Sequence, residues 1–339
     1  MLRMSIPYSD AAALVESCLK GQRRAASQLI TLFESPDPKI VQMASDAVSK
    51  LPFPSQTIGL TGPPGAGKST LLDYAVSLYR ARGVKVGVLA IDPSSPFTGG
   101  ALLGDRIRMD SLRNDTGVFI RSMGSRGATG ALAAAACDAL RVLSAAGYST
   151  VFLETVGAGQ AETEIANLAD TICVVQVPGL GDDIQLMKMG ILEIADVFVV
   201  NKSDKPGAQE LATQIEWAIQ DQPRESCRVF RQLGSTFDGK LNGLGWTPAV
   251  VLVSALQRKN GEALVEACDR HLAFLRQPAL EIPLKRNRIT REVVCRACRR
   301  FQELLDDQLA VNGSLMALID ACVEGTLSPN EVVSQYMKK

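Results

Sequence analysis

The chain has 339 residues, of which 46% are hydrophobic, and its 36 lysines and arginines balance 36 aspartates and glutamates. A chain of this length forms one large domain with additions, or two domains. The balanced charge argues against a nucleic-acid-binding or membrane-binding protein, because both usually carry a basic excess. The first residues lack the apolar core of a signal peptide, and no apolar run reaches the roughly 18 residues of a membrane span. We therefore expect a cytoplasmic protein.

The first part of the chain has the pattern of helices. Apolar residues recur at helical spacing in three segments, at 10–21, 24–34 and 41–51. The sequence SPDP at 35–38 interrupts this pattern, and LPFPS at 51–55 is typical of a linker. We expect residues 1–53 to form a helical N-terminal region.

Short apolar runs then alternate with helical patterns. The candidate strands are TIGLTG, KVGVLAID, GVFIRS, TVFLETVG, TICVVQVP, VFVVNKSD and AVVLVSAL. Such alternation predicts an α/β fold with a mainly parallel sheet flanked by helices. From residue 278 onward the pattern is again helical and amphipathic. We expect a core domain over 54–277 and a helical C-terminal extension over 278–339.

The sequence GPPGAGKS at 62–69 matches the phosphate-loop pattern G-x-x-x-x-G-K-[ST], and it lies between a predicted strand and a predicted helix. Glycines at these positions let backbone N–H groups surround a phosphate, and the following helix points its positive end at the same place. The lysine can reach the β- and γ-phosphates, and the serine hydroxyl can bind Mg²⁺. The candidate phosphate-binding residues are Gly62, Gly65, Ala66, Gly67, Lys68, Ser69 and Thr70.

The sequence NKSD at 201–204 follows an apolar run and matches the guanine-recognition motif N-K-x-D. The carboxylate of Asp204 can accept from both N1–H and the 2-amino group of guanine, a donor pair that adenine lacks. Asn201 can bond the opposite edge of the base, and the stem of Lys202 can lie over the ring. A second segment, VSAL at 253–256, supplies Ser254, Ala255 and Leu256 as further base contacts. Together with the phosphate loop, these motifs favour GTP and GDP over ATP.

Acidic residues near the predicted strand ends are candidates for Mg²⁺ binding. The metal candidates are Ser69, Asp92, Asp105 and Glu154, and the catalytic candidates are Lys68, Glu154 and Gln160. Glu154 begins E-T-V-G, which has the spacing of the D-x-x-G switch. Small GTPases place a water-orienting glutamine directly after that glycine, where this chain has Ala158. Slow hydrolysis by the isolated protein is therefore expected. The alternative for each acidic residue is an ordinary strand-end carboxylate.

Five segments in this order, GLTGPPGAGKST, AIDPSSPFTGGALLGDRIRM, ETVGAGQAE, VPGLGDDIQLMKMGILEIAD and NKSD, resemble the methylmalonyl-CoA mutase-associated GTPases. These are G-protein chaperones of adenosylcobalamin-dependent mutases, formerly described as arginine/ornithine transport kinases. The resemblance covers nearly the whole chain. It implies a P-loop GTPase fold, GTP and GDP as ligands, and Mg²⁺.

The resemblance also implies a role and partners. The protein would gate cofactor loading of an adenosylcobalamin-dependent acyl-CoA mutase and protect that enzyme, and its C-terminal helices would form a homodimer. The segment PGLGDDIQLMK would be a switch that contacts the mutase, with Asp182, Gln185 and Lys188 at its polar positions. A solvated loop that leads into a helix is the alternative for this segment. The family serves several acyl-CoA mutases, so the client's substrate stays open.

Other functions remain open from the residues alone. A metal-insertion GTPase usually carries histidine-rich or cysteine-rich segments, whereas this chain has one histidine and eight scattered cysteines. A small-molecule kinase or a non-catalytic nucleotide-dependent scaffold would share the phosphate loop. Two pairs, Cys268 with His271 and Cys295 with Cys298, have the composition of a zinc site, but amphipathic helices often bury cysteines at such spacing.

Overall fold

The computed structural model describes residues 11–92, 112, 114–124, 131–155, 167–179, 191–220, 227–233, 244–310 and 314–336. Its strands are β1 (Gln56–Thr61), β2 (Val86–Asp92), β3 (Val118–Gly124), β4 (Thr150–Thr155), β5 (Thr171–Gln176), β6 (Val197–Asn201) and β7 (Ala249–Val253). Its helices are α1 (Ala11–Leu19), α2 (Arg23–Phe33), α3 (Pro38–Val48), α4 (Lys68–Ala81), α5 (Ala131–Ala145), α8 (Ile191–Ile194), α9 (Ala208–Gln220), α10 (Arg228–Leu233), α11 (Gly261–Leu275), α12 (Pro278–Ala310), α13 (Ser314–Val323) and α14 (Pro329–Tyr336).

The strands form one sheet in the order β3-β2-β4-β1-β5-β6-β7, and every neighbouring pair is parallel. All residues of β1, β4, β5 and β6 are buried, as expected for continuous apolar runs in a sheet that is covered on both faces. The predicted α/β fold class is therefore confirmed. Because the strands are parallel, the loops that follow β1, β4 and β6 start from the same edge of the sheet.

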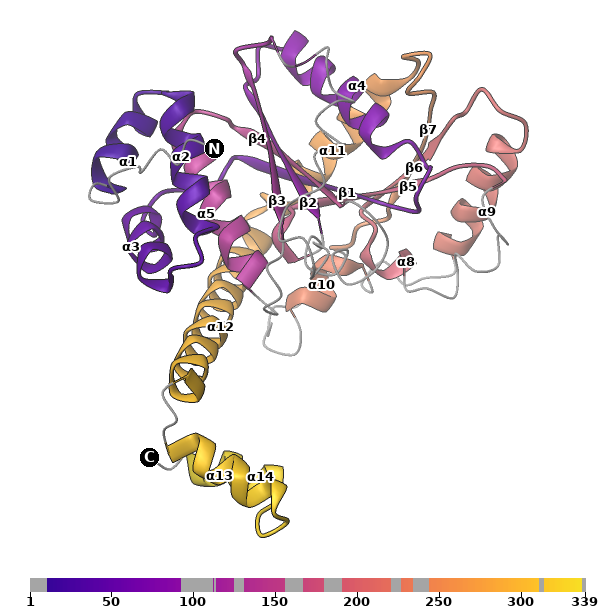
Figure 1. Ribbon diagram of the computed structural model, residues 1–339. Helices are drawn as coiled ribbons and strands as arrows, with labels where there is room; N and C mark the ends of the chain where they lie inside the picture. The colour runs from indigo at the N-terminus through magenta and orange to yellow at the C-terminus, as the bar shows by residue number, and fades with distance from the viewer. Residues whose placement is uncertain are drawn as a thin grey trace.

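Helices cover both faces of the sheet (Figure 1). One face packs against α4 and α11, in a cluster that includes Leu71, Leu72 and Val265. The other face packs against α5 and α9, and α1 to α3 belong to the same cluster of buried residues. The division of the chain at residues 53 and 277 stays a prediction, and the N-terminal helices share their core with the sheet.

Local sequence explains how individual helices begin. The Asp37 side chain accepts a hydrogen bond from the Lys39 backbone N–H at 2.9 Å, and Pro38 occupies the first position of α3, where its missing N–H costs nothing. Gly67, before α4, has φ +83°, a conformation that glycine adopts without strain. The short turn between β1 and α4 can therefore bring the first turn of α4 to the sheet edge.

The long helix α12 leaves the core and carries α13 at its far end, where α14 packs on α13 (Figure 1). Buried ion pairs fix its middle to α5: Glu292 pairs with Arg141 at 2.7 Å, and Arg296 pairs with Asp138. The Ser45 hydroxyl of α3 donates to the same Asp138 at 2.6 Å. In the described part of the chain, no helix is both long and apolar enough to cross a membrane.

Candidate functional site

The phosphate loop runs from the end of β1 to the start of α4. At Gly62, φ is +141°, and a Cβ atom would lie 2.2 Å from the backbone oxygen of Val175 on the neighbouring strand β5. Gly65 and Gly67 also have positive φ, +79° and +83°. A side chain at Gly62 would collide with backbone, so the tight path of this loop requires glycine.

The ammonium group of Lys68 lies inside the loop. Lys68 is 8% exposed, and its Nζ donates to the Gly62 carbonyl at 2.7 Å and to the Pro63 carbonyl at 3.2 Å. The ammonium thus stands at the N-terminal end of α4, where the helix dipole also favours an anion. A phosphate entering the loop can accept hydrogen bonds from this ammonium in place of the carbonyls. Thr70, in the same turn of α4, is exposed.

The Ser69 hydroxyl donates to Oε1 of Glu154 at 2.7 Å. Glu154 lies near the carboxyl end of β4 and is 2% exposed. A hydroxyl and a buried carboxylate in contact beside a phosphate loop are the oxygen ligands that Mg²⁺ prefers, so these residues fit a magnesium ion. Asp92 ends β2, whose Ala90 pairs with Glu154. The remaining candidates Asp105, Gln160, Asp182, Gln185 and Lys188 lie outside the described residues.

Asn201 ends β6 and joins the two nucleotide motifs. Its Nδ2 donates to the Ala66 carbonyl of the phosphate loop at 2.8 Å, and its Oδ1 accepts from the Ala255 backbone N–H at 3.1 Å. The adjacent Lys202 has φ +57°, and its Nζ donates to the Gly65 carbonyl at 2.8 Å. The two loops that were predicted to bind the phosphates and the base are therefore hydrogen-bonded to each other.

Asp204 is exposed at the same edge and accepts a hydrogen bond from the Ser254 hydroxyl. This hydrogen bond lowers the pKa of the Asp204 carboxyl below its ordinary value, and the nearby Lys205 and Lys259 act in the same direction. Leu256, two residues after Ser254, is 84% exposed. The arrangement presents an ionised carboxylate and an apolar side chain to solvent, which suits a purine with donors on one edge.

The cysteines and histidine that could resemble a zinc site face other partners. The Cys268 sulfur lies 3.5 Å from that of Cys173, and Nδ1 of His271 lies 2.9 Å from the Thr171 hydroxyl. On α12, Cys298 is exposed. Among the described residues, no group of three or more His, Cys, Asp or Glu side chains could hold a metal ion.

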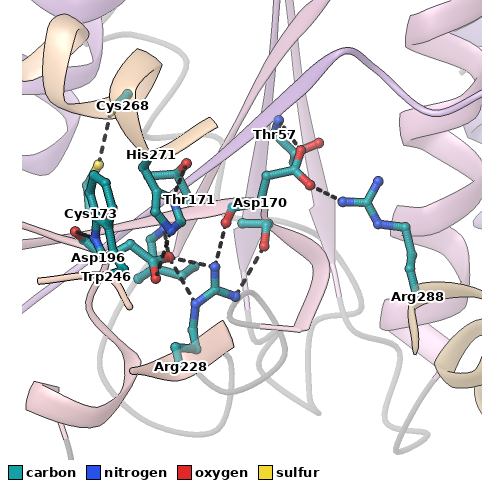
Figure 2. Close-up of polar contacts among 12 residues, drawn as sticks. Thr57, Asp170, Thr171, Cys173, Asp196, Arg228, Trp246, Cys268, His271 and Arg288 are labelled. Carbon is teal, nitrogen blue, oxygen red and sulfur yellow. Dashed lines mark hydrogen bonds and ion pairs between the residues drawn. The ribbon is translucent and has the colours of Figure 1, made fainter. Parts of the chain in front are cut away.

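Sequence reasoning missed a buried polar network at the opposite edge of the sheet (Figure 2). Asp196, 0% exposed, accepts from Nε of Arg228 at 2.9 Å and from the Ile172 backbone N–H at 2.8 Å. Nε2 of His271 lies 3.4 Å from the same carboxylate, yet burial lowers the pKa of His271 to about 4. A usable signal existed in the sequence: Asp170 and Asp196 each stand directly before an apolar strand, in DTICVV and DVFVVN.

The comparisons with known proteins agree with this geometry. A family model, methylmalonyl-CoA mutase-associated GTPase MeaB, matches residues 26–309. A predicted GTPase of Pyrococcus abyssi is 45% identical over 83% of this chain and 82% of its own length. The mouse mitochondrial methylmalonic aciduria type A homolog is 30% identical over 96% of this chain and 78% of its own. The crystal structure of an LAO/AO transport system kinase superposes with TM-score 0.66 at 26% identity, covering 97% of this chain and 98% of the other.

The phosphate loop and the bonded N-K-x-D motif are features of a GTPase, and several relatives, among them those of Pyrococcus abyssi and Escherichia coli, carry that name. The family model spans most of the chain, including all seven strands of the sheet and all of α12 but its last residue. The chain is a guanine-nucleotide-binding GTPase and belongs to the methylmalonyl-CoA mutase-associated GTPase family MeaB.

Proposed function

We propose that this GTPase gates the loading of an adenosylcobalamin-dependent acyl-CoA mutase and protects that enzyme. The observation that carries the proposal is the direct bonding of the guanine motif to the phosphate loop through Asn201, in a chain whose family is defined by association with a mutase. Methylmalonyl-CoA mutase or a related acyl-CoA mutase is the client, and the complex acts in the cytoplasm.

The nucleotide would lie across the loops at the carboxyl edge of the sheet. The phosphates would be held by the backbone of Gly62–Thr70 and by Lys68. The base would be held by Asn201 and Asp204, with the stem of Lys202 over the ring. An ionised Asp204 accepts from two guanine donors, and it would face no such pair in adenine, so GTP would be strongly favoured over ATP.

Hydrolysis converts GTP and water into GDP and phosphate. Ser69 and Glu154 would hold Mg²⁺, with Asp92 and Asp105 as further ligands directly or through water, and the ion would neutralise charge on the β- and γ-phosphates. Ala158 stands where a small GTPase carries its water-orienting glutamine, and Gln160 lies two residues further along. The isolated protein would therefore hydrolyse GTP slowly, and binding of the mutase would complete the catalytic site.

If the mutase binds the GTP-bound and GDP-bound forms of this protein with different affinities, GTP hydrolysis shifts the equilibrium between the two complexes by that difference in affinity. We assign the contact to the segment with Asp182, Gln185 and Lys188, where Gln185 and Lys188 are spaced for one face of a helix. This assignment makes the mutase both the activator of hydrolysis and the receiver of the conformational signal.

A homodimer is the second part of the proposal, and its interface would be α12. One side of α12 packs on the core through Leu280 and Glu292, which are 0% and 8% exposed. The other side leaves Ile282, Ile289 and Val293 exposed at helical spacing, at 68%, 48% and 59%. Further exposed apolar residues on the same helix are Val294, Phe301, Leu304 and Leu309. A stripe of this extent is a typical protein–protein contact.

The test is GTP turnover with and without the cognate mutase. We expect the mutase to accelerate hydrolysis by about tenfold or more, because it completes a site that lacks the water-orienting glutamine. Lys188→Ala should keep nucleotide affinity and basal turnover but lose most of this acceleration. Lys39→Ala, an exposed lysine on α3, is the matched control and should be accelerated like the wild type.

Two results would contradict the proposal. If the isolated wild type hydrolyses GTP as fast as the complex, the mutase is not the activator. If Lys188→Ala is accelerated as strongly as the wild type, the segment is not the switch. Transfer of phosphate to a small-molecule acceptor instead of water would indicate a kinase, and nickel-dependent turnover would indicate a metal-insertion GTPase.

A further inference from the structure

A small cavity lies at the edge of the sheet where the strands begin, opposite the edge that carries the phosphate loop. Its volume is about 50 Å³, and its lining comes from the residues just before β5, from α10, from the end of α11 and from the base of α12. Three arginines line it, Arg228, Arg288 and Arg291, together with Asp170. Figure 2 shows Asp170 between the guanidinium groups of Arg228 and Arg288. A pocket with such a polar lining suits water or a polar ligand, whereas empty cavities in proteins are apolar.

Two of the three arginines are neutralised by carboxylates. Arg228 pairs with Asp196 at 2.5 Å, with the two side chains 6% and 0% exposed. Arg288 pairs with Asp170. Asp170 also accepts from the Thr57 backbone N–H at 2.8 Å, so its charge is already balanced and hydrogen-bonded. Asp196 and Asp170, the carboxylates beside these arginines, are therefore both engaged in ion pairs.

Arg291 is different. Among the residues that the structure describes, this half-buried arginine makes no ion pair with any carboxylate. Burial lowers the pKa of its guanidinium, and the like charge of Arg228 lowers it further. The cavity thus carries one surplus positive charge in a setting that disfavours it, because a half-buried cation is stabilised by an anionic partner.

We propose that this cavity is a second ligand site, separate from the nucleotide site, and that it binds a tetrahedral oxyanion of the size of phosphate or sulfate. Arg291 supplies the charge. Its planar fork of N–H donors matches two oxygens of such an ion. Arg288 donates to Asp170 through one nitrogen and retains further N–H donors, and Asn287 adds an amide from the same helix.

The size of the cavity supports an ion and excludes a nucleotide. One water needs roughly 10–15 Å³ of such volume, so about 50 Å³ holds a few waters or one tetrahedral oxyanion. The bound ion would contact α12 and lie beside Arg228 of α10. It would therefore brace the base of α12 against the underside of the sheet, where Asp170 connects to Thr57 at the start of β1.

The experiment is equilibrium dialysis of labelled inorganic phosphate against the full chain, saturated with a non-hydrolysable GTP analogue so that the β- and γ-phosphate positions of the nucleotide site are filled. Ionic strength is held constant with chloride. We expect the wild type to bind one phosphate per chain, and Arg291→Gln to bind it about tenfold more weakly or worse, since it loses charge-assisted hydrogen bonds. Arg286→Gln makes the same charge change at an exposed position of α12 and should bind like the wild type.

The GDP affinity of each variant reports whether it has folded. Arg291→Lys provides a milder change, because it keeps the charge and loses the fork, and should bind phosphate with intermediate affinity. A second arm replaces phosphate by glycerol 3-phosphate. Equal binding of the ester would identify a phosphate group of a larger molecule as the ligand, whereas binding of inorganic phosphate alone would identify the free ion.

Either of two results would overturn the proposal. The first is that the wild type saturated with the GTP analogue binds no phosphate up to about 10 mM, well above a millimolar dissociation constant. The second is that Arg291→Gln or Arg291→Lys, with GDP affinity intact, binds phosphate as tightly as the wild type.

Discussion

The buried pair of Arg228 and Asp196 provides a severe test of how this fold is held together. In Arg228→Ala, Asp196 keeps its hydrogen bond from the Ile172 backbone N–H at 2.8 Å and loses those from Arg228 Nε at 2.9 Å and Nη2 at 2.5 Å. The carboxylate is 0% exposed, so water cannot replace the lost donors without opening the core. His271 stands 3.4 Å away but is neutral near pH 7, because burial lowers its pKa to about 4.

The magnitude follows from this geometry. Removing one partner of a buried ion pair leaves an uncompensated charge and costs about 3–5 kcal/mol. The backbone carbonyls of Ala169 and Asp170, which accept from Arg228 at 3.3 and 2.5 Å, lose a donor as well. Since domains are stable by only about 5–15 kcal/mol, we expect this single substitution to remove a large fraction of the stability.

The matched control is Arg231→Ala on the same helix. Arg231 pairs with Glu193, but these side chains are 38% and 59% exposed. An exposed ion pair contributes about 0.2–1 kcal/mol, so this variant should unfold close to the wild type. The comparison holds the helix and the type of substitution constant and changes the burial of the pair.

The assay is urea unfolding of wild type and both variants at the same concentration of GDP, because a bound nucleotide stabilises the folded state. The free energy of unfolding is obtained from the midpoint and the slope m of each curve. We expect Arg228→Ala to lose several kcal/mol more than Arg231→Ala. If both variants lose the same small amount of stability, the buried pair does not hold α10 to the sheet.

Other predictions address pH, the loops and the interface. Burial lowers the pKa of His271, the one histidine of the chain, from its usual 6.5 to about 4 in the folded protein. Between about pH 6.5 and 4 the unfolded chain therefore binds more protons than the folded chain. Stability should fall as pH drops through this window by about 3 kcal/mol, and unfolding curves of His271→Gln should lack this component. Gly62→Ala places Cβ 2.2 Å from a backbone oxygen of β5, and calorimetry should find GDP binding lost. Asp204→Asn should weaken GDP about ten- to a hundredfold and improve xanthosine diphosphate, measured by calorimetry; unchanged GDP affinity would contradict the guanine assignment. Replacing Ile289 and Val293 by glutamate should convert the proposed dimer to a monomer in light scattering, since the exposed stripe of α12 would carry charge.

The sequence alone was enough to predict the strands and to place the phosphate-loop and NKSD motifs at the ends of two of them. The central strands β1, β4, β5 and β6 are short apolar runs whose residues are buried on both faces, so consecutive residues such as VFVVN reveal them in the sequence. The phosphate loop is likewise local, because its glycines, Lys68 and Ser69 lie within one turn and the start of one helix. The strand runs and the phosphate-loop motif can be recognised in the sequence because each depends on residues that are near neighbours along the chain.

Only the tertiary structure could join residues that lie far apart in the chain. Asn201 reaches Ala66 across 135 positions, and Arg296 reaches Asp138 across 158. No periodicity or motif encodes which acidic residue meets which arginine, because that choice depends on strand order and on where α12 crosses α5. The cavity around Arg291 has the same origin: its charged residues come from α10, from α12 and from Asp170 just before β5, and it exists only where the folded chain brings these segments into contact.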